Sequence, residues 1–232
     1  MATATGQQVL PFYFVFDESK SMEYNGGIEA INQSLPNLHA AIARDPLVND
    51  KTRISMISFS SDAQVLVPLT SAADITEVPG VVAKSSTNYD SVFELLKSQI
   101  PSDITSLKDA GYAVLRPTVF FISDGEPTDP GKWEKTHADL TDPTNPRHAN
   151  IIAFGVDAAE KTTMARVATI ACFLAEEGID PGAALREIIR SCVDSVVQSA
   201  TSSGSGMGAP TPTLIIPAAP PGSISIPLHP LD

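Results

Sequence analysis

Oxygen-bearing side chains follow the first apolar segment of the chain in a D-x-S-x-S pattern, which is formed by Asp17, Ser19 and Ser21. Three such side chains at alternate positions of a loop can surround a single point. Asp124 comes directly after another apolar segment, and Thr87 lies in a polar stretch between the two. Hydroxyl and carboxylate oxygens form a hard ligand set that suits Mg²⁺ or Mn²⁺ rather than zinc. These residues indicate a divalent metal site if the fold brings them together.

The elements that would position these residues are apolar segments of strand length. Unbroken apolar runs are typical of strands buried on both faces of a parallel sheet. The segment at 64–69 contains Pro68, which suits a short strand at a sheet edge. The predicted strands cover residues 9–16, 53–60, 64–69, 118–123 and 151–156.

Amphipathic segments alternate with these strands and predict helices. Apolar residues recur at steps of three and four from Ile28 onward, and the Asp180-Pro181 pair is typical of a helix start. Helices are predicted from residue 28 to about residue 44, over 88–100, over 161–170, and from residue 181 to at least residue 196.

Strands that alternate with helices predict an α/β fold, in which a mostly parallel sheet has helices on both faces and one short antiparallel edge strand. Ligands of such open sheets bind at the carboxyl ends of the strands. Asp17 and Asp124 each follow a predicted strand directly, so we expect both at that edge.

The composition excludes several classes of protein. The 232 residues include 15 Lys and Arg against 27 Asp and Glu, and the net charge of −12 disfavours nucleic acid and anionic membranes as partners. The start of the chain has neither a basic segment nor a long apolar run, so we expect a cytoplasmic protein without a signal peptide. The two cysteines, Cys172 and Cys192, have apolar neighbours and are predicted to be core residues.

The chain divides into three parts by composition. Residues 1–8 form an N-terminal extension, residues 9–200 one domain, and residues 201–232 a Ser/Gly/Pro-rich segment predicted to be a flexible tail. The tail contains two apolar islands at 214–216 and 224–226. Each island is either part of a linker or a strand that docks on a sheet edge.

The order of the polar motifs resembles the metal-ion-dependent adhesion site (MIDAS) of the von Willebrand factor A (vWA) family, over roughly residues 9–200. Within that family the chain is most similar to the bacterial tellurium-resistance-associated TerY-like group. The similar segments are PFYFVFDESKSM, EAINQSL, TVFFISDGEPTD and IIAFGV. The resemblance implies a Rossmann-like three-layer fold and a non-enzymatic module that binds a partner protein.

The resemblance also implies roles for five residues. Ser19 and Ser21 would bind the metal directly, Thr87 would bind it in some states, and Asp17 and Asp124 would hold it through water. The metal would be Mg²⁺ or Mn²⁺, with Ca²⁺ as a third candidate. A divalent ion held mainly by neutral hydroxyls stays electrophilic, so its open position would take an Asp or Glu of the partner. The TerY-like group implies an intracellular adaptor in a stress or tellurium-resistance system, with a protein kinase or phosphatase as partner.

Four positions depart from the family pattern without removing a ligand. Lys20 replaces the usual glycine, and its stem must carry the ammonium group into solvent to avoid repelling a metal. Ser85 and Ser86 replace a glycine pair, which bears on how freely the Thr87 loop moves. Pro36 stands inside the first predicted helix, where we expect a kink.

Two other functions are compatible with parts of the pattern. In a phosphatase of the haloacid dehalogenase kind, Asp17 would be the nucleophile and Asp124 a Mg²⁺ ligand, but the general acid expected two positions after the nucleophile is replaced by Ser19. The third alternative is a scaffold whose site has lost its metal.

Other polar and aromatic residues are not part of this pattern. Trp133 is either a partner-facing aromatic or a helix anchor. Surface or capping roles are expected for four histidines, His39, His137, His148 and His229.

Overall fold

The computed structural model describes residues 6–129, 131–157, 159–202 and 212–228. An eight-stranded sheet has the order β3-β2-β1-β5-β6-β7-β8, and the short strand β4 pairs with β1 beside this path. In this order β2, β1, β5, β6 and β7 run parallel to one another, whereas β3 and β8 are antiparallel to their neighbours at the two edges. The strands are β1 (Gln8–Asp17), β2 (Thr52–Phe59), β3 (Ala63–Thr70), β4 (Ala113–Val114), β5 (Thr118–Ser123), β6 (Asn150–Gly155), β7 (Ala171–Ala175) and β8 (Ser223–Ile226).

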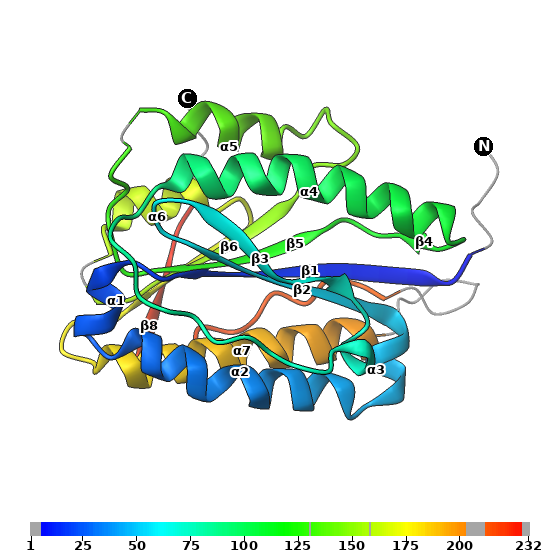
Figure 1. The fold of residues 1–232 in the computed structure, drawn as a ribbon, viewed down its shortest axis with the longest axis horizontal. Coiled ribbons are helices and arrows are strands. Elements are labelled where there is room, and N and C mark those ends of the chain that lie inside the picture. Colours follow the sequence, from blue (N-terminus) through cyan, green and yellow to red (C-terminus); the bar gives the residue numbers. More distant parts are fainter. Residues whose placement is uncertain (1–5, 130, 158, 203–211, 229–232) are drawn as a thin grey trace.

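Helices lie on both faces of the sheet, so the molecule has three layers (Figure 1). One face packs against α2, α3 and α7, and the other packs against α4, α5 and α6. The helical elements are α1 (Lys20–Tyr24), α2 (Gly27–Ala43), α3 (Pro46–Lys51), the 3-10 turn η1 (Ala72–Asp74), α4 (Tyr89–Asp109), α5 (Trp133–Thr141), α6 (Lys161–Val167) and α7 (Pro181–Thr201).

The central strand β1 sends alternate side chains into the two cores. Phe12, Phe14 and Phe16 pack on the side of α2 and α7, and Tyr13 and Val15 pack on the side of α4. All five side chains are fully buried. Burial on both faces explains the unbroken apolar run in the sequence and confirms the predicted α/β class.

The parallel register brings the carboxyl ends of β1, β2 and β5 to the same edge of the sheet. Asp17 pairs with Phe59 at the end of β2, and Phe16 pairs with Ile122 near the end of β5. Asp124 follows β5 directly. The sheet therefore places Asp17 and Asp124 at the same edge, as the sequence predicts.

The five predicted strands are all present, with ends shifted by one residue at most. The predicted helices differ more. Helix α4 continues through Pro101 to Asp109 instead of ending at residue 100, because Ile104 extends the buried stripe by another turn. Helix α6 ends at Val167, because the chain must turn there to enter β7, and the Thr169 hydroxyl accepts a hydrogen bond from the Ile151 backbone at that turn.

The C-terminal segment 212–228 lies against the domain. The sequence predicts a flexible tail over 201–232, and the structure differs for this part because its apolar residues reach buried positions. Leu214 packs against the core beside α7, Ser195 donates a hydrogen bond to the Ile215 carbonyl at 2.5 Å, and Ile226 is only 5% exposed. The island at 224–226 is thus a strand docked on the sheet edge. The sequence predicts one antiparallel edge strand, but the sheet has two, β3 and β8.

Several smaller expectations can be checked in the fold. Cys172 and Cys192 are free and buried, as predicted for core residues. Pro36 is on the exposed side of α2, which continues past it because the opposite side is anchored in the core. Across the described ranges, no helix has both the length and the apolar character needed to span a bilayer.

Candidate metal site

The short helix α1 folds the D-x-S-x-S segment into a compact group at the end of β1. Asp17 is the last residue of the strand, Ser19 is the N-cap of α1, and Ser21 lies in its first turn. Glu18, between them, donates its backbone N–H to the Phe59 carbonyl at 2.9 Å, which ties the segment to the end of β2. Strand and helix together point both serine side chains toward the end of β5.

Three side-chain oxygens converge between these elements. The Ser19 and Ser21 hydroxyl oxygens are 3.0 Å apart, and Ser21 donates to Asp124 Oδ1 at 2.9 Å. Ser19 Oγ lies 3.5 Å from the same carboxylate oxygen. Two hydroxyls and one carboxylate oxygen thus meet at one point, which is the arrangement that the sequence predicts.

Asp17 lies behind this group and is fully buried. Its Oδ1 accepts the backbone N–H of Ser19 at 2.8 Å, and its Oδ2 accepts the Ser123 hydroxyl at 2.6 Å. Burial raises the pKa of the Asp17 carboxyl to about 7; the two serine hydrogen bonds lower it, and the charge of Asp124 raises it. Asp17 therefore orients Ser19 through the hydrogen bond from its backbone N–H.

Tyr89 continues this hydrogen-bonded chain into the core. Its hydroxyl donates toward Ser123 Oγ at 3.0 Å, and Ser123 donates in turn to Asp17. Burial raises the Tyr89 pKa above its usual value, so the phenol stays protonated and remains a donor. Sequence reasoning missed both Tyr89 and Ser123, because neither belongs to a polar motif.

Thr87 approaches the group from the loop before α4. It is 5% exposed, and its Oγ1 lies 3.7 Å from the place that a Cβ on Gly125 would occupy. Its carbonyl accepts both the backbone N–H of Thr128, at 2.8 Å, and the Thr128 hydroxyl, at 3.1 Å. Thr87 is thus held beside Gly125, the residue that follows Asp124.

The Thr87 loop has further attachments. Ser61 Oγ lies 3.2 Å from Ser85 Oγ and 2.8 Å from Ser86 Oγ. The two serines that replace the family's glycine pair therefore attach the loop to the end of β2. Asp129 accepts the first backbone N–H groups of α4, those of Tyr89 at 3.0 Å and of the next residue at 2.8 Å.

Glu18 is buried and adds a second link to this loop. Its Oε1 lies 2.5 Å from the Lys84 ammonium, and its carbonyl accepts the Lys84 backbone N–H at 2.7 Å. Within the described residues, Glu18 Oε2 has no hydrogen-bond partner. Lys20, in contrast, is exposed, and its ammonium lies 5.6 Å from the centre of the Tyr24 ring. The Lys20 stem thus carries its charge outward along α1.

The donor chemistry of the converging group fits a hard divalent cation. The described residues contain no cluster of three or more His, Cys, Asp or Glu side chains able to hold a metal. A metal at this site would depend on hydroxyl oxygens with few carboxylates, a set that keeps the ion electrophilic.

The remaining sequence candidates have structural roles. Trp133 is 2% exposed and packs against Tyr89 and Phe93, so it anchors α5. His39, His137 and His148 each contact a backbone carbonyl, and His229 lies outside the described residues.

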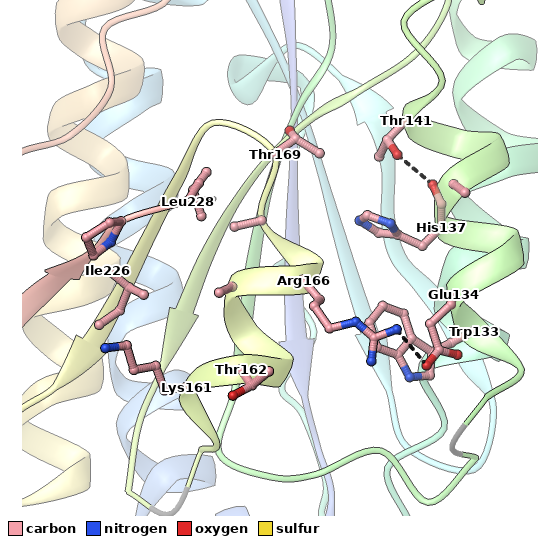
Figure 2. Close-up of a pocket in the computed structure, with 14 residues that line it drawn as sticks. Trp133, Glu134, His137, Thr141, Lys161, Thr162, Arg166, Thr169, Ile226 and Leu228 are labelled. Atoms are coloured by element: carbon pink, nitrogen blue, oxygen red, sulfur yellow. Dashed lines mark hydrogen bonds and ion pairs between the residues drawn. The ribbon is translucent and has the colours of Figure 1, made fainter. Parts of the chain in front are cut away.

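A groove of about 700 Å³ lies elsewhere, between α5, α6 and β8 (Figure 2). None of the five predicted metal residues lines it. Its polar groups are largely used within the fold, since Arg166 pairs with Glu134 at 3.0 Å over the Trp133 ring, and His137 Nε2 contacts the Val167 carbonyl at 2.8 Å.

The family model of the von Willebrand factor type A domain matches residues 12–176. The match covers most of the chain, and the protein therefore belongs to this family. Domains of the family are generally interaction modules without enzymatic activity. A search of curated protein sequences finds no match to the chain.

Solved structures share the fold at low sequence identity. A von Willebrand factor type A protein from Catenulispora acidiphila is 14% identical, with a TM-score of 0.58 over 83% of this chain and 43% of that one. Proximal thread matrix protein 1 from the mussel byssus, with a zinc-occupied MIDAS motif, is 12% identical, with a TM-score of 0.57 over 83% of this chain and 48% of that one. The vWF domain of the pilus tip protein Mfa5 from Porphyromonas gingivalis is 11% identical, with a TM-score of 0.58 over 85% of this chain and 98% of that domain. The chain thus spans less than half the length of the first two proteins.

Proposed function

We propose that the chain is a non-enzymatic, divalent-metal-dependent protein-binding module. The observation that carries the proposal is the convergence of Ser19 Oγ, Ser21 Oγ and Asp124 Oδ1 within 2.9–3.5 Å of one another. In this proposal the two serines bind the metal directly, Asp17 and Asp124 hold it through water, and Thr87 joins in some states.

The proposed ion is Mg²⁺ or Mn²⁺, with Ca²⁺ as a third candidate. When bound, it supplies an electrophilic coordination position for an Asp or Glu carboxylate of a partner protein. The chain's own residues orient the ligands: Asp17 fixes the Ser19 backbone, and Tyr89 fixes Ser123. Because the mussel protein has zinc in its MIDAS, Zn²⁺ also belongs among the ions to be titrated.

The geometry of Asp17 argues against the phosphatase alternative. A nucleophilic carboxylate needs access to the substrate, but Asp17 is fully buried and both of its oxygens accept hydrogen bonds. Ser19 occupies the place of the general acid and cannot replace it. An aryl phosphate assay with Mg²⁺ is therefore expected to show no hydrolysis above that of a sample lacking the protein.

The proposed cellular role of the module rests on the resemblance of its motif segments to the TerY-like group. On that basis we propose a cytoplasmic adaptor in a bacterial stress or tellurium-resistance system. A protein kinase or phosphatase of the same system is the proposed partner.

Titration with Mn²⁺ separates this module from a metal-free scaffold. Because a ligand that binds only the native state stabilises it by about 2.7 kcal/mol at a hundred times its Kd, the melting temperature of the wild-type protein should rise with Mn²⁺. Ser19→Ala should abolish most of that rise, whereas Ser98→Ala, an exposed hydroxyl on α4, should leave it intact. Equal melting curves with Mn²⁺ and with chelator would favour the scaffold.

Partner binding is tested by affinity capture from native cells in Mg²⁺ and again in chelator. Proteins captured by the wild type in Mg²⁺ should be lost in chelator and with Ser19→Ala, and retained with Ser98→Ala. Capture that ignores both the chelator and the Ser19 substitution would show that the metal is not needed for partner binding.

A further inference from the structure

Asn25 lies at the end of α1 and contacts two carboxylates from distant parts of the chain. Its Nδ2 donates to Asp124 Oδ2 at 2.6 Å and to Asp157 Oδ2 at 3.2 Å. Asp124 follows β5 and Asp157 follows β6, so one amide group joins three loops at this edge of the sheet. No motif in the sequence indicates this contact.

The orientation of the Asn25 amide is set by its own turn. Its Oδ1 accepts the backbone N–H of Gly27 at 3.0 Å, which directs Nδ2 toward the carboxylates. Gly26 has φ of 77°, a left-handed conformation that allows the chain to reverse between α1 and α2. A Cβ on Gly27 would lie 2.9 Å from Asn25 Oδ1 and 2.9 Å from the Met22 methyl carbon, so the missing side chain makes room for the amide.

The two oxygens of the Asp124 carboxylate have different partners. Oδ2 is bonded to Asn25, and Oδ1 is left facing the Ser19 and Ser21 hydroxyls. Asp157 lies close enough for its charge to act on Asp124. A neutral amide that donates to both carboxylates reduces the repulsion between them. An acidic or apolar side chain at position 25 could not donate these hydrogen bonds.

We infer that Asn25 is a positioning residue of the metal site, which holds Asp124 so that Oδ1 faces the two serine hydroxyls and keeps Asp157 beside it. The inference deepens the proposed function and rests on it. Replacement of a residue that orients a metal ligand by a hydrogen bond typically lowers metal affinity 10- to 100-fold.

The test measures binding of Mn²⁺ alone to the full chain by titration calorimetry. Asn25→Leu, which keeps the size but removes the donor, should weaken Mn²⁺ binding about tenfold or more. Asn25→Gln, which keeps the amide, should retain affinity within about threefold of the wild type. Asn37→Leu makes the same change at an exposed position of α2 and should leave affinity unchanged.

Metal-free unfolding curves separate positioning from a loss of folding. Asn25→Leu should unfold within a few degrees of the wild type without metal, while its response to Mn²⁺ is reduced. If Asn25→Leu does not fold, Asn25→Ser, whose side chain is too short to reach Asp124, takes its place in the titration. Wild-type Mn²⁺ affinity in the variant that folds would overturn the inference.

Carboxyl ¹³C shifts of the metal-free protein give a readout that does not depend on the proposed function. Asn25→Leu should move the side-chain shifts of Asp124 and Asp157, and Asn37→Leu should move neither. Unmoved shifts in Asn25→Leu would refute the positioning role. A wild-type protein that binds no Mn²⁺, while Asn25→Leu still moves these shifts, would refute the metal-dependent function and leave the positioning of Asp124 established.

Discussion

At pH 8 and without divalent cations, Asp17→Asn is expected to be more stable than the wild-type protein by roughly 2–4 kcal/mol. A carboxyl whose pKa is about 7 in the folded state, against an ordinary value of 3.8, binds its proton more tightly when folded. Since one pKa unit corresponds to about 1.4 kcal/mol, the upper limit of the effect is about 4 kcal/mol. The neutral amide avoids this cost of burying a charge.

The direction of the pH dependence follows from the raised pKa. The stability that a protonated Asp17 contributes is fully present below about pH 4 and is lost as the pH rises through 7. The Asp17 contribution to the free energy of unfolding should therefore fall from pH 5 to pH 8. His137 works in the opposite direction, because burial lowers its pKa, so the comparison with Asp17→Asn at each pH isolates the Asp17 contribution.

Urea unfolding of both proteins at pH 5 and pH 8 in chelator measures the effect. The difference between them should be less than half as large at pH 5 as at pH 8, because the unfolded chain already ionises Asp17 above about pH 4. Mn²⁺ should restore stability to the wild type alone. Asp103→Asn is the matched control. The Asp103 carboxylate lies on α4, outside the site, and accepts hydrogen bonds from the Tyr13 hydroxyl of β1 and the Gln99 amide of α4, so the Mn²⁺ response of this variant should persist. A wild-type protein that gains stability from pH 5 to pH 8 by the same amount as Asp17→Asn would contradict the prediction.

The central site could be predicted because strand ends are visible in a sequence. Buried parallel strands are unbroken apolar runs that stop abruptly, and parallel pairing brings their ends together. Asp17, Ser19, Ser21 and Asp124 therefore meet as expected, and Thr87 lies beside Gly125, which follows Asp124. The comparisons then establish the family, while the ligand roles of these five residues stay predictions.

The supporting residues could not be predicted because their contacts depend on how helices pack. Tyr89 has the pattern of any core residue of α4, and only the packing of that helix brings its hydroxyl to Ser123. Asn25 contacts Asp124 from the turn between α1 and α2, where Gly26 has a left-handed conformation. Single-sequence patterns describe the faces of elements, and these contacts are made between elements.

Short elements escaped prediction for a related reason. Helix α5 presents few apolar side chains, chiefly Trp133 and Leu140, which is too short a pattern to recognise. Strand β7 has five residues and follows a helix with only a three-residue gap. Each gains its stability from the sheet or the core that it covers, in keeping with the weak intrinsic preference of short segments.

Strand β8 leads to the second large effect: Ile226→Ala is expected to lower the free energy of unfolding by about 2–4 kcal/mol. Ile226 is 5% exposed, pairs with Cys172 of β7, and lines the groove beside α6 together with Leu228 (Figure 2). Removal of its side chain leaves a cavity at the sheet edge. Ile224, two residues earlier on the same face, is 49% exposed, so Ile224→Ala should cost less than about 1 kcal/mol.

The matched pair of substitutions tests whether the C-terminal segment belongs to the folded domain in solution. Urea unfolding of the two variants should separate them clearly, and a chain that ends at residue 202 should lose at least as much stability as Ile226→Ala. Without β8, β7 keeps its pairing with β6 but its outer edge is unpaired, and an exposed strand edge promotes association between chains. Light scattering should therefore detect larger species in the shortened chain. Equal, small effects of Ile224→Ala and Ile226→Ala, with a shortened chain as stable as the full one, would show that residues 212–228 add nothing to the folded domain.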